Sequence, residues 1–262
     1  MQTPGLVASD LDGTLVRSDG TVSPRTVAAM ARVEAAGVPF VMVTGRPPRW
    51  MAEVSGATGH RGVAVCANGA LVYDLHTERV VQTSLLTEES AGEVAAALRK
   101  AIPGIAFAVE RADLTFEHDP AYVPKWQPAS TRPLPVDELV SGGVVKLLAR
   151  HSSLDADALL AAAHAAVGDL ATLTHSSTDG LLEVSATGVS KASGLAALAA
   201  QHGVPADRVV AFGDMPNDLP MLAWAGHGVA VANAHPEVLA IAAEVTGRND
   251  DDGVAQVLER WF

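Results

Sequence analysis

Short apolar segments recur along the chain, with helical patterns between them. They are LVA at 6–8, VPFVMV at 38–43, VAVC at 63–66, VVAF at 209–212 and VAVA at 228–231. Segments that are apolar at nearly every position are typical of strands that helices cover on both faces. The pattern therefore predicts an α/β fold in which helices flank a parallel sheet.

Start and stop signals frame the helices between these strands. In TVSPRTVAAMARVEAAG, Ser23 is a candidate N-cap, Pro24 fits the first helical position and Gly37 is a stop signal. In VSKASGLAALAAQHG, Ser190 and Gly203 mark the start and the end in the same way. These signals predict one helix after the first strand and another shortly after residue 190.

The middle of the chain has a different pattern. LVYD and RVVQ on either side of DLHTE resemble the strands of a hairpin. From about Leu85 the pattern changes to helix, strands, a Pro-rich stretch, strand, helix and strands. Lys146 lies in one of these apolar strands, and we expect it at a strand edge or facing solvent. The segment is predicted to be an α+β module inserted into the α/β domain.

Composition and charge narrow the classes of partner. The chain has 262 residues, enough for two domains, and its formal net charge of -12 opposes binding to nucleic acid or to an anionic membrane surface. Cys66 is the single cysteine, which excludes an intrachain disulfide and fits a reducing compartment. No apolar stretch reaches the ~20 residues of a membrane span, and no signal-peptide pattern is present. We expect a cytoplasmic protein.

Polar residues follow the predicted strands at the point where each one ends. In open parallel sheets, ligands bind outside the carboxyl ends of the strands. Lys191 opens the helix that follows the inserted module. The residues that this rule brings to one edge of the sheet are Asp10, Asp12, Thr44, Gly45, Arg46, Asn68, Gly69, Gly213 and Asp214.

The carboxylates in this group predict a cation site. In an extended chain Asp10 and Asp12 point the same way, and a hard divalent cation would relieve their repulsion. Mg²⁺ prefers a few carboxylate or carbonyl oxygens together with water and substrate phosphate. Asp214 and Asp218 are four residues apart, so a helical turn would place them on one face. The cluster is predicted to bind Mg²⁺ and to leave one carboxylate free to react.

A phosphate ester would suit this set of groups. Asp10 could attack phosphorus to form an aspartyl-phosphate, and Asp12 could protonate the leaving alcohol and then activate water. Transition-state charge would be met by Mg²⁺, the Lys191 ammonium, the Thr44 hydroxyl and loop amides near Gly13 and Gly45.

Four segments together resemble the ordered motifs of the haloacid dehalogenase superfamily. They are DLDGTL at 10–15, VTGR at 43–46, GVSKASGL at 188–195 and GDMPND at 213–218. ANGA at 67–70 and VAVANA at 229–234 resemble the Cof-type phosphatase branch of that superfamily. The motifs occur in the right order over almost all of the predicted α/β domain, which argues against chance.

The resemblance implies a fold and an activity. It implies a Rossmann-like core over residues 1–84 and 186–262, with an inserted α/β cap domain over 85–185. It also implies Mg²⁺-dependent phosphatase activity on a small phosphorylated metabolite, in a monomer or homodimer. We expect the cap to close over the substrate and supply specificity.

The resemblance also implies a role for each matching residue. Asp10 would be the nucleophile and Asp12 the acid/base, while Thr44, Gly45 and Lys191 would bind phosphate. Ala192 stands where the family often has glycine, which leaves the lysine intact. The Mg²⁺ site would comprise Asp10, the Asp12 backbone carbonyl and Asp214, with Asn217 and Asp218 in or near the shell.

Several assignments stay open on the sequence alone. Arg46 is either a substrate contact or one side of a surface ion pair, and Asn68 either contacts substrate or supports its turn. The cap residues that could touch substrate are Arg111, His118, Lys125 and Trp126. The alternative functions are a phosphomutase acting on sugar phosphates and a non-catalytic protein that binds a phosphorylated metabolite.

Overall fold

The structure is a computed structural model that describes residues 3–124 and 133–262. Lys125 and Trp126 lie outside the described residues. Contacts divide the chain into two compact units, one formed by residues 1–82 and 190–262 and the other by residues 83–189. The expected domain limits at 84/85 and 185/186 stay a prediction.

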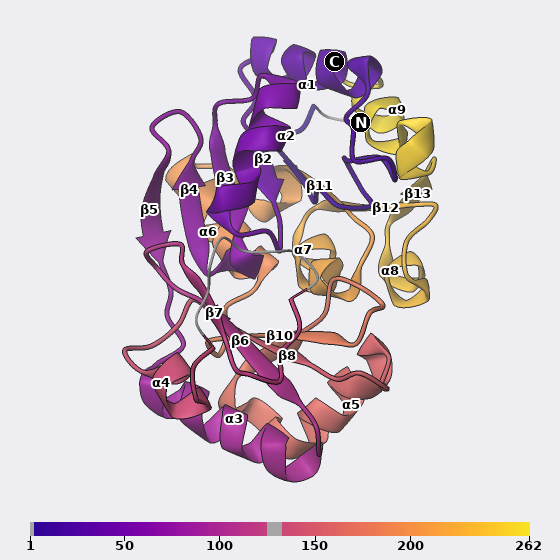
Figure 1. Cartoon of the computed structure of the whole chain (residues 1–262). Coiled ribbons are helices and arrows are strands. Elements are labelled where there is room, and N and C mark those ends of the chain that lie inside the picture. The colour runs from indigo at the N-terminus through magenta and orange to yellow at the C-terminus, as the bar shows by residue number, and fades with distance from the viewer. Residues whose placement is uncertain (1–2, 125–132) are drawn as a thin grey trace. The chain divides into compact units, whose positions relative to one another are not determined.

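The first unit is built on a sheet in the order β13-β12-β11-β1-β2-β3-β4-β5 (Figure 1). The pairs from β13 through β3 are parallel, and β4 turns back antiparallel to β3. The strands are β1 (Leu6–Ser9), β2 (Phe40–Val43), β3 (Val63–Cys66), β4 (Leu71–Asp74), β5 (Arg79–Thr83), β11 (Val209–Gly213), β12 (His227–Val231) and β13 (Glu244–Thr246). The prediction of a parallel sheet is confirmed.

Helices of this unit bury the apolar strands. They are α1 (Pro24–Ala35), α2 (Met51–Thr58), α6 (Lys191–Gln201), α7 (Leu219–Trp224), α8 (Pro236–Ile241) and α9 (Gly253–Leu258). One core cluster joins Leu6 and Ala8 of β1 to Leu195 of α6, Met221 of α7 and Val238 of α8. Helix α1 contacts β2 and α9. Burying apolar strand side chains in this way stabilises the parallel sheet.

The predicted helix signals act as expected at both helix starts. The Ser23 side chain accepts a hydrogen bond from the Thr26 backbone N–H, and Pro24 is the first residue of α1. Ser190 and Ser193 form a reciprocal capping box at the start of α6. This cap fixes the first turn of α6, and therefore the place of Lys191, relative to the preceding chain.

The second unit is an antiparallel sheet in the order β7-β6-β8-β10-β9 with helices against it. The strands are β6 (Ala106–Glu110), β7 (Phe116–His118), β8 (Lys146–Arg150), β9 (Thr172–Thr174) and β10 (Leu181–Ser185). The helices are α3 (Glu88–Ala101), α4 (Val136–Val140) and α5 (Ala156–Val167), whose apolar faces share one core with the sheet. The prediction of an inserted α+β module is confirmed.

Lys146 corrects one expectation from the sequence. Its Nζ donates to Glu183 Oε1 at 2.6 Å, and the two side chains are 3% and 5% exposed. Lys146 begins β8 and Glu183 lies in β10, which pairs directly with β8. The prediction of a solvent-facing lysine is wrong, because the neighbouring strand supplies a carboxylate that compensates the buried charge.

None of the helices in the described ranges is both long enough and apolar enough to cross a membrane.

Candidate functional site

The nucleophile candidate lies directly after β1. Asp10 is 5% exposed, and its backbone N–H donates to the Phe212 carbonyl of β11 at 3.0 Å. Because β1 and β11 are parallel neighbours, their carboxyl ends bring Asp10 and Asp214 to the same edge of the sheet. The sheet topology therefore creates the juxtaposition that the sequence predicts.

A buried lysine holds two of the carboxylates. Lys191 Nζ donates to Asp10 Oδ1 at 2.5 Å and to Asp218 Oδ1 at 2.6 Å. Lys191 is 1% exposed and Asp218 is 0% exposed. Lys191 is the first residue of α6, so the Ser190 cap positions this ammonium. Charges this deeply buried persist only when they are paired and hydrogen-bonded.

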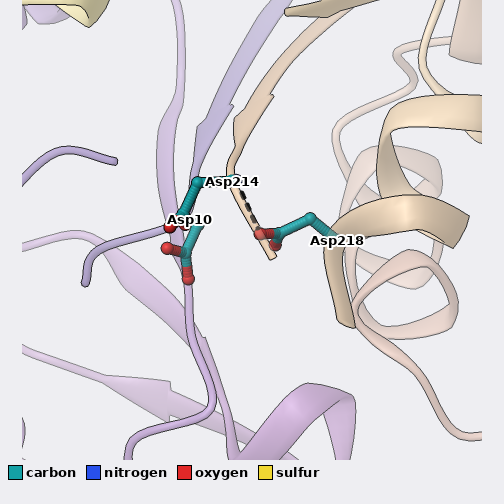
Figure 2. A group of neighbouring side chains, drawn as sticks. All are labelled: Asp10, Asp214 and Asp218. Atoms are coloured by element: carbon teal, nitrogen blue, oxygen red, sulfur yellow. Dashed lines mark hydrogen bonds between the residues drawn. The ribbon is translucent and has the colours of Figure 1, made fainter. Parts of the chain in front are cut away.

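Asp218 also closes the loop after β11. Its Oδ2 accepts hydrogen bonds from the backbone N–H groups of Asp214 and Met215, each at 3.0 Å. Figure 2 shows Asp10, Asp214 and Asp218 and marks the hydrogen bond from the Asp214 backbone. Both oxygens of Asp218 are thus engaged, one by Lys191 and the other by the loop.

The three carboxylates are close enough to share one cation. Each of Asp10, Asp214 and Asp218 offers an oxygen, and these oxygens lie within 4.8 Å of one another. Three carboxylates and one ammonium leave an excess of negative charge in a buried place. Oxygen donors in this arrangement fit Mg²⁺, whose preferred ligands are carboxylates and water. The residues present therefore fit the predicted metal.

Burial and mutual charge shift the pKa values of the groups in this cluster. Burial raises the pKa of Asp10 well above its usual value even though Lys191 opposes the shift. Burial and the Asp218 charge raise the pKa of Asp214 to about 7, against a hydrogen bond from Thr14. Burial lowers the pKa of Lys191, but Asp10 and Asp218 outweigh it, so the net shift is upward. The lysine therefore keeps its proton.

Asp12 has a different environment from Asp10. Strand β1 ends at Ser9, so the extended-chain argument that aligned the two aspartates does not reach Asp12. The Asp12 side chain is 58% exposed, and Arg46 donates to it through Nε at 2.8 Å and Nη2 at 2.5 Å. Arg46 is therefore one side of an ion pair, which is one of the two alternatives that the sequence left open, and its partner is the acid/base candidate.

The segment after β2 is tied to the segment after β3. Thr44 is 1% exposed, and its hydroxyl oxygen accepts a hydrogen bond from the Arg46 backbone N–H at 3.0 Å. The Asn68 backbone N–H donates to the Thr44 carbonyl at 3.0 Å. Gly45 lies between Thr44 and Arg46 in this connection. The predicted phosphate-binding loop is therefore held by its neighbour in the sheet.

Asn217 and Asn68 meet inside the protein. Asn217 Nδ2 donates to Asn68 Oδ1 at 3.1 Å, and the residues are 5% and 2% exposed. Asn217 belongs to the short turn Pro216–Asp218, next to the aspartate that binds Lys191. The structure therefore places Asn68 against a predicted metal-shell residue.

Sequence reasoning missed supporting residues around Asp214. The Thr14 hydroxyl donates to Asp214 Oδ1 at 2.8 Å, and Asn233 Nδ2 donates to the Gly13 carbonyl at 2.8 Å. Thr14 lies within DLDGTL and Asn233 within VAVANA, two motifs from which the sequence predicts no role for these side chains. Polar side chains inside the motifs were the available signal.

Gly13→Ala is expected to lower activity about 100-fold, as misplacement of a reacting group by ~1 Å can do. A Cβ at Gly13 would collide with Asp214 Oδ2, and the backbone φ of +82° disfavours alanine. Steady-state kinetics would measure the loss. Gly37→Ala is the matched control, because its φ is +73° and a Cβ there meets nothing within 4 Å. Equal activity losses in the two variants would contradict a steric effect on Asp214.

Comparison with known proteins assigns the chain to a family. A family model described as haloacid dehalogenase-like hydrolase matches residues 7–258. The chain is 30% identical to the Bacillus subtilis 5-amino-6-(5-phospho-D-ribitylamino)uracil phosphatase YitU over 277 residues, covering 99% of this chain and 98% of YitU. It is also 30% identical to the Escherichia coli pyridoxal phosphate phosphatase YbhA over 274 residues, covering 98% of each.

A solved structure supports the fold independently. A haloacid dehalogenase-like hydrolase from B. subtilis superposes with a TM-score of 0.82 at 24% identity, covering 98% of this chain and 100% of that one. At this identity the likeness concerns the fold. The family model and the sequence matches show that the chain belongs to the haloacid dehalogenase superfamily, as a hydrolase of its Cof-type phosphatase branch.

Proposed function

We propose that the chain is a Mg²⁺-dependent phosphatase that hydrolyses a small phosphorylated metabolite through an aspartyl-phosphate on Asp10. The observation that carries the proposal is the buried Asp10–Lys191–Asp218 ion group with Asp214 beside it. Buried carboxylates with raised pKa values are typical of functional sites.

The first step is attack by an Asp10 carboxylate oxygen on phosphorus. A phosphorus–oxygen bond to Asp10 forms while the bond to the leaving alcohol breaks, and Asp12 gives its proton to that alcohol oxygen. In the second step water attacks the same phosphorus, Asp12 takes the proton of the water, and the bond to Asp10 breaks. Phosphate leaves, and both aspartates return to their starting state.

Arg46 orients the Asp12 carboxylate for the second step, in which that carboxylate takes the proton of the attacking water. Two N–H groups of one planar guanidinium fix both carboxylate oxygens, which is a geometrically specific interaction. The exposure of Asp12 leaves it accessible to a leaving group. Arg46 therefore supports the acid/base in this proposal, and direct substrate contact remains a separate prediction.

Lys191, Thr44 and the Gly45 amide bind the phosphoryl group. The Thr44 oxygen already accepts from the Arg46 backbone, so its hydroxyl proton can be donated to phosphate. The Lys191 ammonium lies against the nucleophile and offsets charge that develops on the phosphoryl oxygens.

Asp10, the Asp12 backbone carbonyl and Asp214 would hold Mg²⁺, with Asn217 and Asp218 near its shell. When bound, the ion would offset the charge of the carboxylates and of the phosphoryl oxygens. Asp218 contributes mainly by holding Lys191 and the loop after β11, because both of its oxygens have protein partners.

The relatives suggest where to search for the substrate. YitU is named for a phosphoribitylamino-uracil and YbhA for pyridoxal phosphate. We propose a small phosphate monoester as the substrate class, and these two compounds head a test panel that also includes sugar phosphates and flavin mononucleotide.

Phosphate release from this panel, with Mg²⁺ and with EDTA, tests the proposal. Turnover that requires Mg²⁺ supports it. Isomerised sugar phosphate without free phosphate would show a phosphomutase instead. Binding of a compound without any turnover would favour the non-catalytic alternative.

We also propose that residues 85–185 form a cap that closes with substrate. Closure would exclude bulk water, which strengthens electrostatic interactions in the site. Small-angle scattering should show a smaller radius of gyration with Mg²⁺ and a phosphate analogue than without them. An unchanged radius of gyration under saturating conditions would count against closure.

The metal-free protein is expected to lose stability as pH rises from about 4 to 7. Asp214 has a pKa of about 7 in the folded protein, against 3.8 for an aspartate in the unfolded chain. Between these two pH values the folded state therefore binds more protons than the unfolded state. Stability therefore falls as pH rises through this window, by an amount on the order of a few kcal/mol. Asp10 shifts in the same direction.

Thermal melts in EDTA across this pH range would measure the effect. Asp214→Asn is the control, and it should flatten the pH dependence. Mg²⁺ should raise the melting temperature more at pH 8 than at pH 5, because it binds the ionised carboxylates. A wild-type melting temperature that rises with pH relative to Asp214→Asn would contradict the expected sign.

A further inference from the structure

Two buried amides form an isolated pair beside the candidate metal residues. Asn217 Nδ2 donates to Asn68 Oδ1, and this hydrogen bond joins the turn after β11 to the turn after β3. Both side chains are more than nine-tenths buried. Hydrogen bonds between side chains in such a place fix orientation as well as position.

Each amide keeps one polar atom without a protein partner. Asn68 Nδ2 and Asn217 Oδ1 are buried and have no hydrogen-bond partner within residues 3–124 and 133–262. Leaving a buried donor or acceptor unsatisfied is costly, and native proteins rarely do so without a reason. The unpaired atom of Asn217 is an amide oxygen, which can be a ligand of Mg²⁺ or accept a hydrogen bond from a water bound to the ion.

The backbone that carries Asn68 is held in an uncommon conformation. Ala67, Asn68 and Gly69 have φ values of +51°, +56° and +98°. The Ala67 N–H donates to the Arg46 carbonyl at 3.0 Å, and the Asn68 N–H donates to the Thr44 carbonyl. Strained backbone of this kind persists only where its surroundings fix it, and it is common at functional sites.

Close packing on the other side restrains the same turn. A Cβ at Gly69 would collide with the Ser190 carbonyl, which belongs to the cap of α6. The Asn68 turn is therefore fixed against the segment of Thr44 and against the start of the helix that carries Lys191. A rigid turn can hold the Asn217 amide in one orientation.

We propose that Asn68 is a positioning residue for Asn217. By occupying Asn217 Nδ2, Asn68 leaves Asn217 Oδ1 as the atom available to the metal shell. This inference rests on the proposed function, because it takes Asn217 to belong to the Mg²⁺ site.

Asn68→Gly is the informative variant. Glycine adopts positive φ without strain, so it keeps the turn and removes only the amide. Asn217→Ala and the double variant Asn68→Gly/Asn217→Ala complete a cycle. Glu78→Gly is the matched control, because Glu78 also has a positive φ of 55° but is exposed in the turn between β4 and β5.

Calorimetric titration with Mg²⁺ alone is the first readout. We expect Asn68→Gly to weaken Mg²⁺ binding about 10- to 100-fold, as loss of an outer-shell partner does. Asn217→Ala and the double variant should match each other, since Asn68 acts only through Asn217. The Glu78→Gly control should bind Mg²⁺ like the wild type.

Kinetics with p-nitrophenyl phosphate separate positioning from substrate contact. At saturating Mg²⁺ the KM of Asn68→Gly should equal that of the wild type. A raised KM, persisting in the Asn217→Ala background, would overturn the proposal in favour of substrate contact. If the wild type is a Mg²⁺-dependent phosphatase and Asn68→Gly binds Mg²⁺ with the same affinity, this inference is overturned but the proposed function is not. A wild type that neither binds Mg²⁺ nor releases phosphate would overturn the proposed function as well.

Discussion

Asp10→Asn is expected to reduce phosphate release by at least about 10⁴-fold, the scale on which loss of an activated nucleophile acts. An amide cannot attack phosphorus as a carboxylate does. The protein should stay folded, because asparagine has nearly the same shape and Lys191 keeps its second partner, Asp218. Initial rates of phosphate release with Mg²⁺ would measure the loss.

The stability of the same variant carries an independent prediction. Burial raises the Asp10 pKa, which means that the charged carboxylate is unfavourable in the metal-free fold. Asp10→Asn should therefore melt at the same temperature as the wild type in EDTA at pH 8, or at a higher one. A large drop would show that the Asp10–Lys191 contact stabilises the fold more than burial destabilises it.

Asp12→Asn is the matched control for Asp10→Asn, since both change a carboxylate into an amide near the end of β1. Asp12 is exposed and pairs with Arg46, so its replacement leaves the nucleophile intact. We expect Asp12→Asn to slow both chemical steps while Asp10 can still become phosphorylated. After incubation with a substrate that carries a labelled phosphate, covalent label on Asp12→Asn but not on Asp10→Asn would identify Asp10 as the nucleophile. Label on Asp10→Asn would refute the assignment.

Local patterns in the sequence predicted the sheet and the helix starts. Ser23 and Ser190 act through neighbours in the chain, so a short stretch of sequence contains the whole interaction. The apolar segments at 6–8 and 209–212 became the paired strands β1 and β11, because a strand buried on both faces needs apolar side chains at every position. Their pairing then brought Asp10 beside Asp214.

The contacts that the sequence did not reveal join residues far apart in the chain. The Lys146–Glu183 pair depends on which strand neighbours β8, and an apolar segment does not indicate which other strand it pairs with. The Asp12–Arg46 fork depends on how the chain turns after β1 ends. Motif resemblance assigned Asn68 and Asn217 separately, whereas their contact is a property of the folded turns.

Lys191→Met is expected to cost both stability and activity. Methionine fills a similar volume but removes the ammonium from Asp10 and Asp218, which then face each other's charge in a buried place. Removing one partner of a buried ion pair typically costs about 3–5 kcal/mol. For a chain of this size that corresponds to a fall in melting temperature of roughly 10 °C. Differential scanning calorimetry in EDTA at pH 8 would measure it.

A second substitution separates the two roles of this lysine. Lys191→Met/Asp218→Asn removes one of the stranded carboxylates, and asparagine can still accept the backbone hydrogen bonds of Asp214 and Met215. The double variant should therefore regain part of the lost stability. It should not regain activity, because the cation beside Asp10 is still missing. Recovery of turnover in the double variant would mean that Lys191 acts in catalysis only by compensating the charge of Asp218. If Lys191→Met melted at the wild-type temperature, the buried carboxylate charges would be offset without the lysine.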